Sequence, residues 1–280
     1  MNDTDTSPQT GSEHSPNDRA ESAFETLQYT LEENIALITL DRPPANLIDR
    51  QLTLEYHSAL HRANSDPKVR TIILTGAGNG LSGGVNLNYL ESFGSKEMKD
   101  FLRLFYVETM RLVRSLDKPI IAAVHGYARE GACTLAFACD MVIAADDADF
   151  GYPGVPNLAA PPGMHVWFLQ KLIGRMKAAE LIFTGKAIGA LEAEKLGLIT
   201  KVVGAGSLLY EARSMAGKLA KMSPLALKRT RDLMYSMEDM DFSEVPECAL
   251  EALSSAFDSE DSKEARKAFR EKRVPVWTGR

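Results

Sequence analysis

The sequence predicts an α/β fold, because short apolar runs alternate with amphipathic stretches and glycine-rich turns. Val69–Thr75 and Ile120–Val124 are typical of buried strands, and each runs into a turn that contains glycine. Helical stretches separate these runs, as in a sheet whose parallel strands are joined by helices. After residue 163 the pattern becomes helical, and the C-terminal region is expected to lack strands.

The individual elements follow from apolar spacing and from turn residues. Thr26–Thr30 and Ile35–Leu40 are short β-rich runs on either side of Glu32-Glu33-Asn34, which predicts a hairpin. A further strand is expected at Met141–Ala145. One helix is expected to begin at a Ser223 cap, with Pro224 in its first turn. The other helices are expected at Leu52–Ala63, Lys96–Leu116, 131–139, Gly163–Leu172, Met176–Phe183, Ala190–Leu196, Leu208–Met222, Phe242–Phe257 and Ser262–Lys272.

Composition excludes several classes of protein. The 280 residues are 45% hydrophobic and 25% charged, which is typical of a globular protein and not of a disordered, fibrous or disulfide-rich one. Of the net charge of −6, residues 1–22 contribute −4, from five acidic residues and one arginine. The nearly neutral remainder has no electrostatic footprint for nucleic acid or an anionic membrane.

The N-terminus and the cysteines bear on localisation. Residues 1–22 lack aromatic and branched aliphatic side chains, which predicts a disordered acidic tail. The segment also lacks the apolar region of a signal peptide, and no apolar run reaches the ~20 residues that span a bilayer. Cys133, Cys139 and Cys248 form no CxxC pair, so we expect a protein of the reducing cytoplasm.

Two glycine-rich loops follow buried strands and are the first candidates for a functional site. They are Gly80–Leu87 and Gly126–Ala132. Glycine lets backbone N–H groups approach a ligand, and two such groups that converge form an oxyanion hole for a carbonyl that gains negative charge. The alternative is that both loops are plain turns between strand and helix.

Residues in the same order along the chain resemble the crotonase superfamily, the enoyl-CoA hydratase/isomerase-like enzymes. The matching segments are Leu40–Pro43, Ile73–Gly76, Leu81–Asn86, Lys118–Gly126, Ala138–Asp140, Phe183–Gly185, Ala193–Leu198 and Phe269–Arg273. The resemblance implies a crotonase-like spiral of ββα units over residues 23–206 and a C-terminal helical trimerisation region over 207–280. It also implies a homotrimer or a dimer of trimers, and an acyl-CoA thioester as substrate.

The resemblance also assigns roles to particular residues. The backbone N–H groups of Val85 and Gly131 would form the oxyanion hole and stabilise an enolate. The residues expected near the acyl-CoA are Pro44, Ala45, Leu47, Gly83, Asn86, Leu87, Thr134, Pro153, Gly154 and, near the adenine phosphate, Lys228. Asn86 is also interpreted as structural, and His125 as a residue that caps or packs its loop.

Two departures from the family pattern determine the expected chemistry. Thr134 and Gly154 stand where typical hydratases have glutamates. A hydratase needs a carboxylate pair to activate water and deliver a proton, and a threonine hydroxyl is no base near neutral pH. We therefore expect an enzyme that uses the oxyanion hole for decarboxylation, C–C or thioester hydrolysis, or isomerisation.

Three nearby side chains are candidates for a relocated acid or base. Glu130 precedes Gly131 and points into the acyl pocket, or else is a solvated charge beside Arg129. Tyr152 lies near the vacated glutamate position, or else is a half-buried packing residue. His165 opens a helix and has a suitable pKa, or else is a packing or surface residue.

The alternatives to atypical chemistry are an enoyl-CoA hydratase with a relocated acid or base and a catalytically inactive acyl-CoA-binding protein. No residue spacing indicates a metal or a nucleotide cofactor, so no cofactor is expected apart from the CoA of the substrate. The Arg229/Arg231 cluster is interpreted as a solvated helix face.

Overall fold

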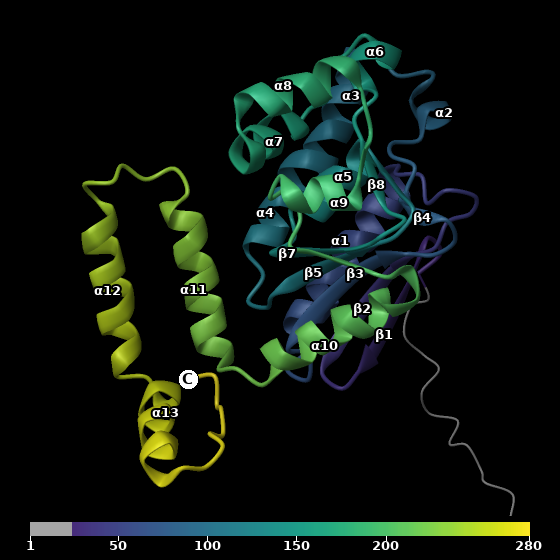
Figure 1. The fold of residues 1–280 in the computed structure, drawn as a ribbon. Coiled ribbons are helices and arrows are strands. Elements are labelled where there is room, and N and C mark those ends of the chain that lie inside the picture. The colour runs from purple at the N-terminus through teal and green to yellow at the C-terminus, as the bar shows by residue number, and fades with distance from the viewer. Residues whose placement is uncertain (1–23) are drawn as a thin grey trace, which may run out of the picture.

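A six-stranded sheet forms the centre of the molecule in the computed structural model, which describes residues 24–280 (Figure 1). Its strand order is β1-β2-β3-β5-β7-β10, and all neighbours are parallel except the hairpin of β1 and β2. The bounds are β1 Leu27–Glu32, β2 Ile35–Leu40, β3 Thr71–Gly76, β5 Ile120–Val124, β7 Met141–Ala145 and β10 Lys201–Val203. Every residue of β3 and β5 is buried, as their unbroken apolar sequences predict.

A second, smaller sheet stands beside the first. It has the order β4-β6-β8-β9, with bounds β4 Gly80–Ser82, β6 Tyr127–Arg129, β8 Asp149–Gly151 and β9 Ile188–Gly189. A short turn joins β3 to β4, β5 to β6 and β7 to β8, so the chain repeatedly passes from the large sheet to the small one. This repeat gives the predicted spiral of ββα units.

The expectation that the C-terminal region lacks strands was wrong, because β9 and β10 both lie after residue 163. These strands have two and three residues. Strands this short are held by the sheet edges of β8 and β7 that they pair with, so their own sequences contain no recognisable alternation.

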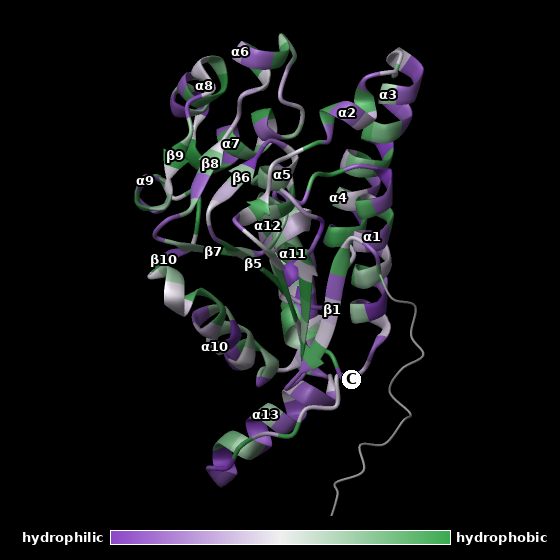
Figure 2. Cartoon of the chain, turned by 90° about the vertical axis from the view of Figure 1, so that its right-hand side faces the viewer, coloured by the Kyte–Doolittle hydropathy of each residue, from purple (hydrophilic) through white to green (hydrophobic). Residues whose placement is uncertain are grey.

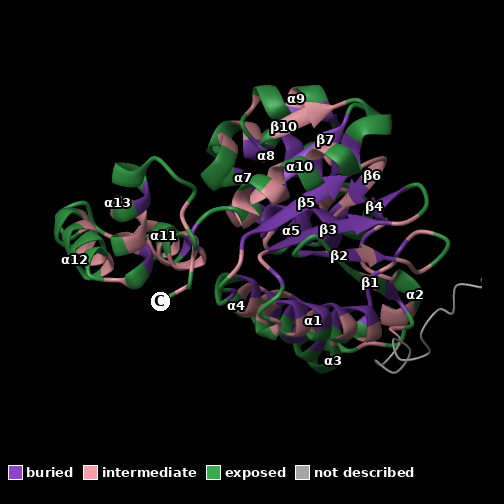
Figure 3. Ribbon diagram, turned by 90° about the horizontal axis from the view of Figure 1, so that it is seen from below, coloured by how far each residue is buried: buried purple, intermediate pink, exposed green. Residues whose placement is uncertain are grey.

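Helices cover both faces of the large sheet (Figures 1 and 3). On one face lie α1 (Arg50–Ser65) and α5 (Gly131–Phe137), which share a core with Ile72 and Leu74. On the other face α10 (Leu208–Ala220) packs against Ile73. Although α10 lies in the range expected for the C-terminal helical region, 207–280, it is part of the sheet's packing. Figure 2 shows that β5 and β7 between these layers are hydrophobic.

Of the remaining helices, α7, α8 and α9 agree with the expected positions, whereas the short elements α2, α6 and η3 were not expected. The bounds are α2 Leu87–Leu90, α6 Gly154–Leu158, α7 His165–Ile173, α8 Arg175–Thr184, α9 Ala190–Lys195 and the 3₁₀ turn η3 Ala205–Ser207. The expected single helix Lys96–Leu116 is instead α3 (Ser95–Leu102), a six-residue π-helix η2 (Arg103–Glu108) and α4 (Thr109–Arg114). A π-helix inserts extra residues into the turn and so changes which side chains face inward.

Three C-terminal helices form an arm that extends away from the sheets (Figures 1 and 3). They are α11 (Pro224–Met237), α12 (Val245–Phe257) and α13 (Glu260–Glu271). The side chain of Ser223 accepts a hydrogen bond from the N–H of Ala226 and so caps α11, as predicted. Phe242, Leu253 and Phe269 are largely exposed along the arm.

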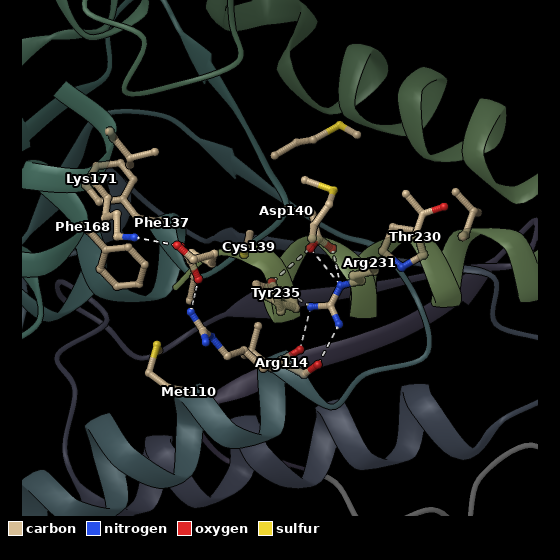
Figure 4. A pocket seen from close by; sticks show the side chains of 18 of the residues that line it. Met110, Arg114, Phe137, Cys139, Asp140, Phe168, Lys171, Thr230, Arg231 and Tyr235 are labelled. Atoms are coloured by element: carbon tan, nitrogen blue, oxygen red, sulfur yellow. Dashed lines mark hydrogen bonds and ion pairs between the residues drawn. The ribbon is translucent and has the colours of Figure 1, made fainter. Parts of the chain in front are cut away.

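Arg231 of α11 attaches the arm to the core (Figure 4). Its Nε donates to both carboxylate oxygens of Asp140, at 2.8 and 2.9 Å. Its two terminal nitrogens donate to the carbonyl oxygens of Leu116 and Val113, at 2.7 and 2.6 Å. Arg231 is only 5% exposed, so the interpretation of the Arg229/Arg231 cluster as a solvated face was wrong for this residue. A cavity of about 440 Å³ lies beside it, between α11 and the core.

The predicted tail, residues 1–22, lies outside the described residues. Within residues 24–280 no helix combines the length and hydropathy needed to cross a membrane.

We predict that Arg231→Ala lowers the free energy of unfolding by about 3 kcal/mol, because it leaves the Asp140 carboxylate without its partner and two carbonyl groups without a donor. Chemical denaturation of purified protein measures this. Lys228→Ala is the control, because Lys228 is partly exposed and its ion pairs are expected to contribute less than about 1 kcal/mol. Equal losses in the two variants would contradict the anchoring role of Arg231.

Candidate active site

Val85 and Gly131 lie side by side because the two strands that lead to them are neighbours. β4 pairs with β6 in parallel, so the loop after β4 runs beside the start of α5. Gly84 is so close to the loop before Gly131 that a Cβ on it would lie 2.9 Å from the carbonyl oxygen of Arg129. With a φ of +94°, Gly84 also has a backbone conformation that suits glycine.

Ile48 holds the first of these two residues in place. Its N–H donates to the carbonyl oxygen of Gly84 at 2.9 Å, and its carbonyl oxygen accepts from the N–H of Asn86 at 2.8 Å. The N–H of Val85 between them, like that of Gly131, makes no hydrogen bond to another described residue. Both predicted donors are therefore available to a ligand.

Gly131 has no room for a side chain. A Cβ there would lie 3.0 Å from the Cδ1 of Ile48 and 3.1 Å from the ring of Phe105. These two apolar side chains pack against the backbone of the candidate oxyanion hole. Sequence reasoning missed both, because each has the pattern of an ordinary core residue.

Glu130 has a strained backbone. Its φ of +43° and ψ of −108° are rarely adopted by residues other than glycine, and such strain costs roughly 1–3 kcal/mol. The N–H of Glu130 donates to the carbonyl oxygen of Gly151 at 3.1 Å, and its carbonyl oxygen accepts from the N–H of Thr134 at 3.2 Å. The junction of β6 and α5 thus forces this conformation on a glutamate. Such outliers are concentrated at functional sites.

The Glu130 carboxylate occupies the space beside Gly154. A Cβ on Gly154 would lie 2.9 Å from Oε1 of Glu130, which is buried and makes no hydrogen bond to the described residues. Oε2 lies 3.4 Å from Nε2 of His165. Glu130 is therefore not a solvated charge beside Arg129, which instead pairs with Asp149. A carboxylate therefore occupies the space that a side chain at position 154 would enter.

His165 and Tyr152 line up behind this carboxylate. Both are 0% exposed, and their ring centroids are 5.2 Å apart. Burial, with the nearby Cys133, raises the pKa of Tyr152 well above its ordinary value, so its hydroxyl remains protonated. Neither ring nitrogen of His165 forms a hydrogen bond within residues 24–280. The alternative that His165 lies at the surface and the alternative that Tyr152 is only half-buried were therefore wrong.

Thr134 and Pro153 complete the surroundings of Glu130. Thr134 is buried in the first turn of α5, and its hydroxyl makes no hydrogen bond to the described part of the chain. Pro153 precedes Gly154, the first residue of α6. Neither residue supplies an acid or a base, as the sequence indicated.

Gly83, Ala45 and Leu47, which were predicted to lie near the acyl-CoA, contact one another. The N–H of Gly83 donates to the carbonyl oxygen of Ala45 at 2.8 Å, and a Cβ on Gly83 would lie 3.1 Å from Leu47. Pro44 directly precedes this contact. In the neighbouring loops, Leu87 is exposed, and the side chain of Asn86 caps α2 by accepting a hydrogen bond from the N–H of Tyr89. Nε2 of His125 lies 3.0 Å from the carbonyl oxygen of Gly78.

Lys228, predicted near the adenine phosphate, lies away from these residues in the described chain. Its Nζ pairs with Asp117 at 2.5 Å and with Asp232 at 3.5 Å. Asp117 comes just before β5, whereas Gly131 follows that strand and β6, so the two lie toward opposite ends of β5. The hydrogen bond with Asp117 also raises the pKa of Lys228.

Tyr106 is a further residue of the site that sequence reasoning missed. It lies in η2, and a Cβ on Gly163 would be 2.5 Å from its hydroxyl. Burial and the negative charge of Glu130 raise its pKa to about 12. No signal in the sequence distinguishes Tyr106 from its neighbours, because its orientation follows from the π-helix.

Comparison with known proteins agrees with this geometry. The family model described as enoyl-CoA hydratase/isomerase matches residues 30–280. A probable enoyl-CoA hydratase of Mycobacterium bovis is 36% identical over 92% of this chain and 99% of its own length, and the carnitinyl-CoA dehydratase of Escherichia coli is 34% identical over 91% and 99%.

A solved structure is similar over a comparable range. The crystal structure of an enoyl-CoA hydratase from Bacillus anthracis has a TM-score of 0.86 and 30% identity, and it covers 91% of this chain and 100% of its own. The strand order, the paired loops and these matches lead to one conclusion. The chain belongs to the enoyl-CoA hydratase/isomerase family, the crotonase superfamily.

Proposed function

We propose that the protein is an acyl-CoA enzyme in which Glu130 is the acid–base group that exchanges protons with the acyl chain. The thioester carbonyl accepts hydrogen bonds from the N–H groups of Val85 and Gly131, which stabilise the enolate as it forms. The observation that supports this most directly is the Glu130 carboxylate, which takes the space beside Gly154 at a cost in backbone strain.

The other polar groups near Glu130 are less suited to proton transfer with the substrate. Thr134 has a hydroxyl of very high pKa, and Gly154 has no side chain. Both ring nitrogens of His165 are enclosed by protein, so this residue acts on Glu130 and not on the acyl chain. We assign His165 as a positioning residue, with Tyr152 packed against it.

One carboxylate is sufficient for isomerisation of a carbon–carbon double bond. Glu130 removes a proton from Cα of a 3-enoyl-CoA, and the electrons delocalise into a dienolate whose oxygen is bound by the Val85 and Gly131 N–H groups. The protonated Glu130 then returns the proton to Cγ, which leaves the double bond between Cα and Cβ. The proton is conserved, and no water is consumed.

Hydration is the second candidate, and the names of the relatives favour it. The similar proteins are called hydratases and, in one case, a dehydratase. In this reaction water adds to Cβ of a 2-enoyl-CoA and Cα receives a proton, with Glu130 as the acid–base group and the same oxyanion hole. A binding protein without turnover remains the alternative from another functional class.

The resemblance also suggests how the protein assembles and where it works. We propose a homotrimer or a dimer of trimers in the cytoplasm, with no cofactor apart from the CoA of the substrate. Phe242, Leu253 and Phe269 leave large apolar side chains exposed along the C-terminal arm, which supports assembly because contact with another copy would remove them from water.

We predict that the enzyme converts 3-enoyl-CoA to 2-enoyl-CoA at least ten times faster than it hydrates crotonyl-CoA. Mass spectrometry distinguishes the products, because hydration adds the mass of water and isomerisation does not. Faster hydration would support the second candidate, and binding without turnover of either ester would support the binding protein.

We predict that Glu130→Gln lowers kcat by roughly 10²–10⁴-fold, the usual contribution of a general acid–base group. Glu130→Gly should be equally inactive but more stable than Glu130→Gln, because glycine removes backbone strain worth roughly 1–3 kcal/mol. Activity assays and thermal unfolding of both variants measure this. If Glu130→Gln keeps wild-type activity, Glu130 is not the acid–base group.

We predict that Gly84→Ala lowers kcat/KM by roughly 10²-fold, because the new methyl group meets the carbonyl of Arg129 and displaces the adjacent Val85 N–H. Gly78→Ala is a matched control: Gly78 also has a positive φ, of +74°, but a Cβ there would have nothing within 4 Å. Steady-state kinetics of both variants test the prediction, and equal activity of the two would argue against the proposed oxyanion hole.

A further inference from the structure

The hydroxyl of Tyr106 has no role in the chemistry described above and no hydrogen-bond partner among the described residues. It forms no hydrogen bond to any residue between 24 and 280, although its ring is partly buried and packs on Phe105 at a centroid distance of 5.1 Å. Phe105 in turn packs against Gly131. The tyrosine therefore forms part of the wall of the acyl site, with a free donor at its end.

The structure makes room for this hydroxyl. Gly163 has a φ of +58°, and a Cβ on it would lie 2.5 Å from the Tyr106 oxygen and 2.7 Å from the ring. The loop that contains Gly163 leads into His165, which contacts the Glu130 carboxylate. Tyr106 thus lies beside the segment that leads to His165, and close enough to Glu130 for that charge to raise the pKa of its phenol.

The charge of Glu130 determines which groups the hydroxyl can bind. Together with burial, that charge raises the pKa of Tyr106 to about 12, so the phenol is neutral and can donate a hydrogen bond at any physiological pH. A substrate carboxylate at this place would be repelled by Glu130, whereas a neutral oxygen would not.

From this arrangement we propose that Tyr106 is a specificity-determining residue whose hydroxyl binds a neutral oxygen, a hydroxyl or a carbonyl, on the acyl chain at or beyond Cγ. The substrates would then be acyl-CoA thioesters with a polar acyl chain and not simple alkenoyl esters. This inference rests on the proposed function, because it requires the acyl chain to extend from the Val85 and Gly131 N–H groups past Glu130.

A general energetic argument favours a polar ligand over simple packing. Phenylalanine would fill the same space without an unpaired hydroxyl, and a polar group that is partly removed from water costs free energy unless a partner is bound. Sites that bind a substrate hydroxyl discriminate strongly against the analogue that lacks it.

The test is a binding experiment with saturated esters, which cannot isomerise or be hydrated. Isothermal titration calorimetry compares butyryl-, pentanoyl- and hexanoyl-CoA with their 4-, 5- and 6-hydroxy counterparts. In the wild-type protein, we expect at least one hydroxylated ester to bind at least tenfold more tightly than its alkyl counterpart. Tyr106→Phe should reduce this ratio to within twofold of unity, while Tyr210→Phe, a change at a largely exposed tyrosine, leaves it unchanged.

A second variant, Gly163→Ala, tests the same hydroxyl in a different way. It should also abolish the preference for hydroxylated esters, because its methyl group displaces the Tyr106 hydroxyl. If the esters bind but none of the hydroxylated ones is preferred, or if the preference survives Tyr106→Phe, this inference is overturned and the proposed function is not. If no CoA ester binds, the proposed function fails together with the inference.

Discussion

The parallel pairing of β4 with β6 is the contact on which the rest of the site depends. Three strands of the large sheet, β3, β5 and β7, lead into the small sheet through tight turns, and two of these turns lie against each other. A Cβ on Gly126 would overlap the carbonyl oxygen of Asn79, and one on Gly80 would lie 2.6 Å from the backbone of Tyr127. Glycine at these positions lets two backbone segments meet without side chains between them, so that the N–H groups after them can face a common ligand.

The same junction explains why Glu130 is both strained and well placed. Its N–H is bonded to β8 and its carbonyl to the first turn of α5, so the backbone must turn through a region that suits glycine. The turn points the carboxylate toward Gly154 and His165 instead of into solvent. Strain of this kind persists only where the surrounding structure imposes it. The enzyme chemistry proposed for this chain would thus arise from a change in which backbone position supplies the carboxylate.

Strands with a continuous apolar sequence were predictable, whereas the π-helix and the shortest strands were not. The bounds of β5 and β7 agree with the expected strands because each is an unbroken apolar run that the core buries on both faces. Lys96–Leu116 was expected as one helix, since its apolar spacing does not reveal the π-helix that contains Tyr106. The short strands β9 and β10 escaped detection because their stability comes from the sheet edges beside them. Arg231 looked like a surface residue because its partners, Asp140 and the carbonyls before β5, are about 90 to 120 residues away in sequence.

By itself, the sequence determined the α/β class, the order of the main elements, the two glycine loops and the absence of a carboxylate at Thr134 and Gly154, because these depend on residue type and local spacing. Only the tertiary structure decided where the candidate side chains lie. It brought the Glu130 carboxylate to Gly154 and enclosed His165 and Tyr152 behind it. It also placed Lys228 beside Asp117, at the opposite end of β5 from Gly131. The direction of a side chain follows from its backbone conformation and its distant neighbours, and neither is encoded in the spacing of residues along the chain.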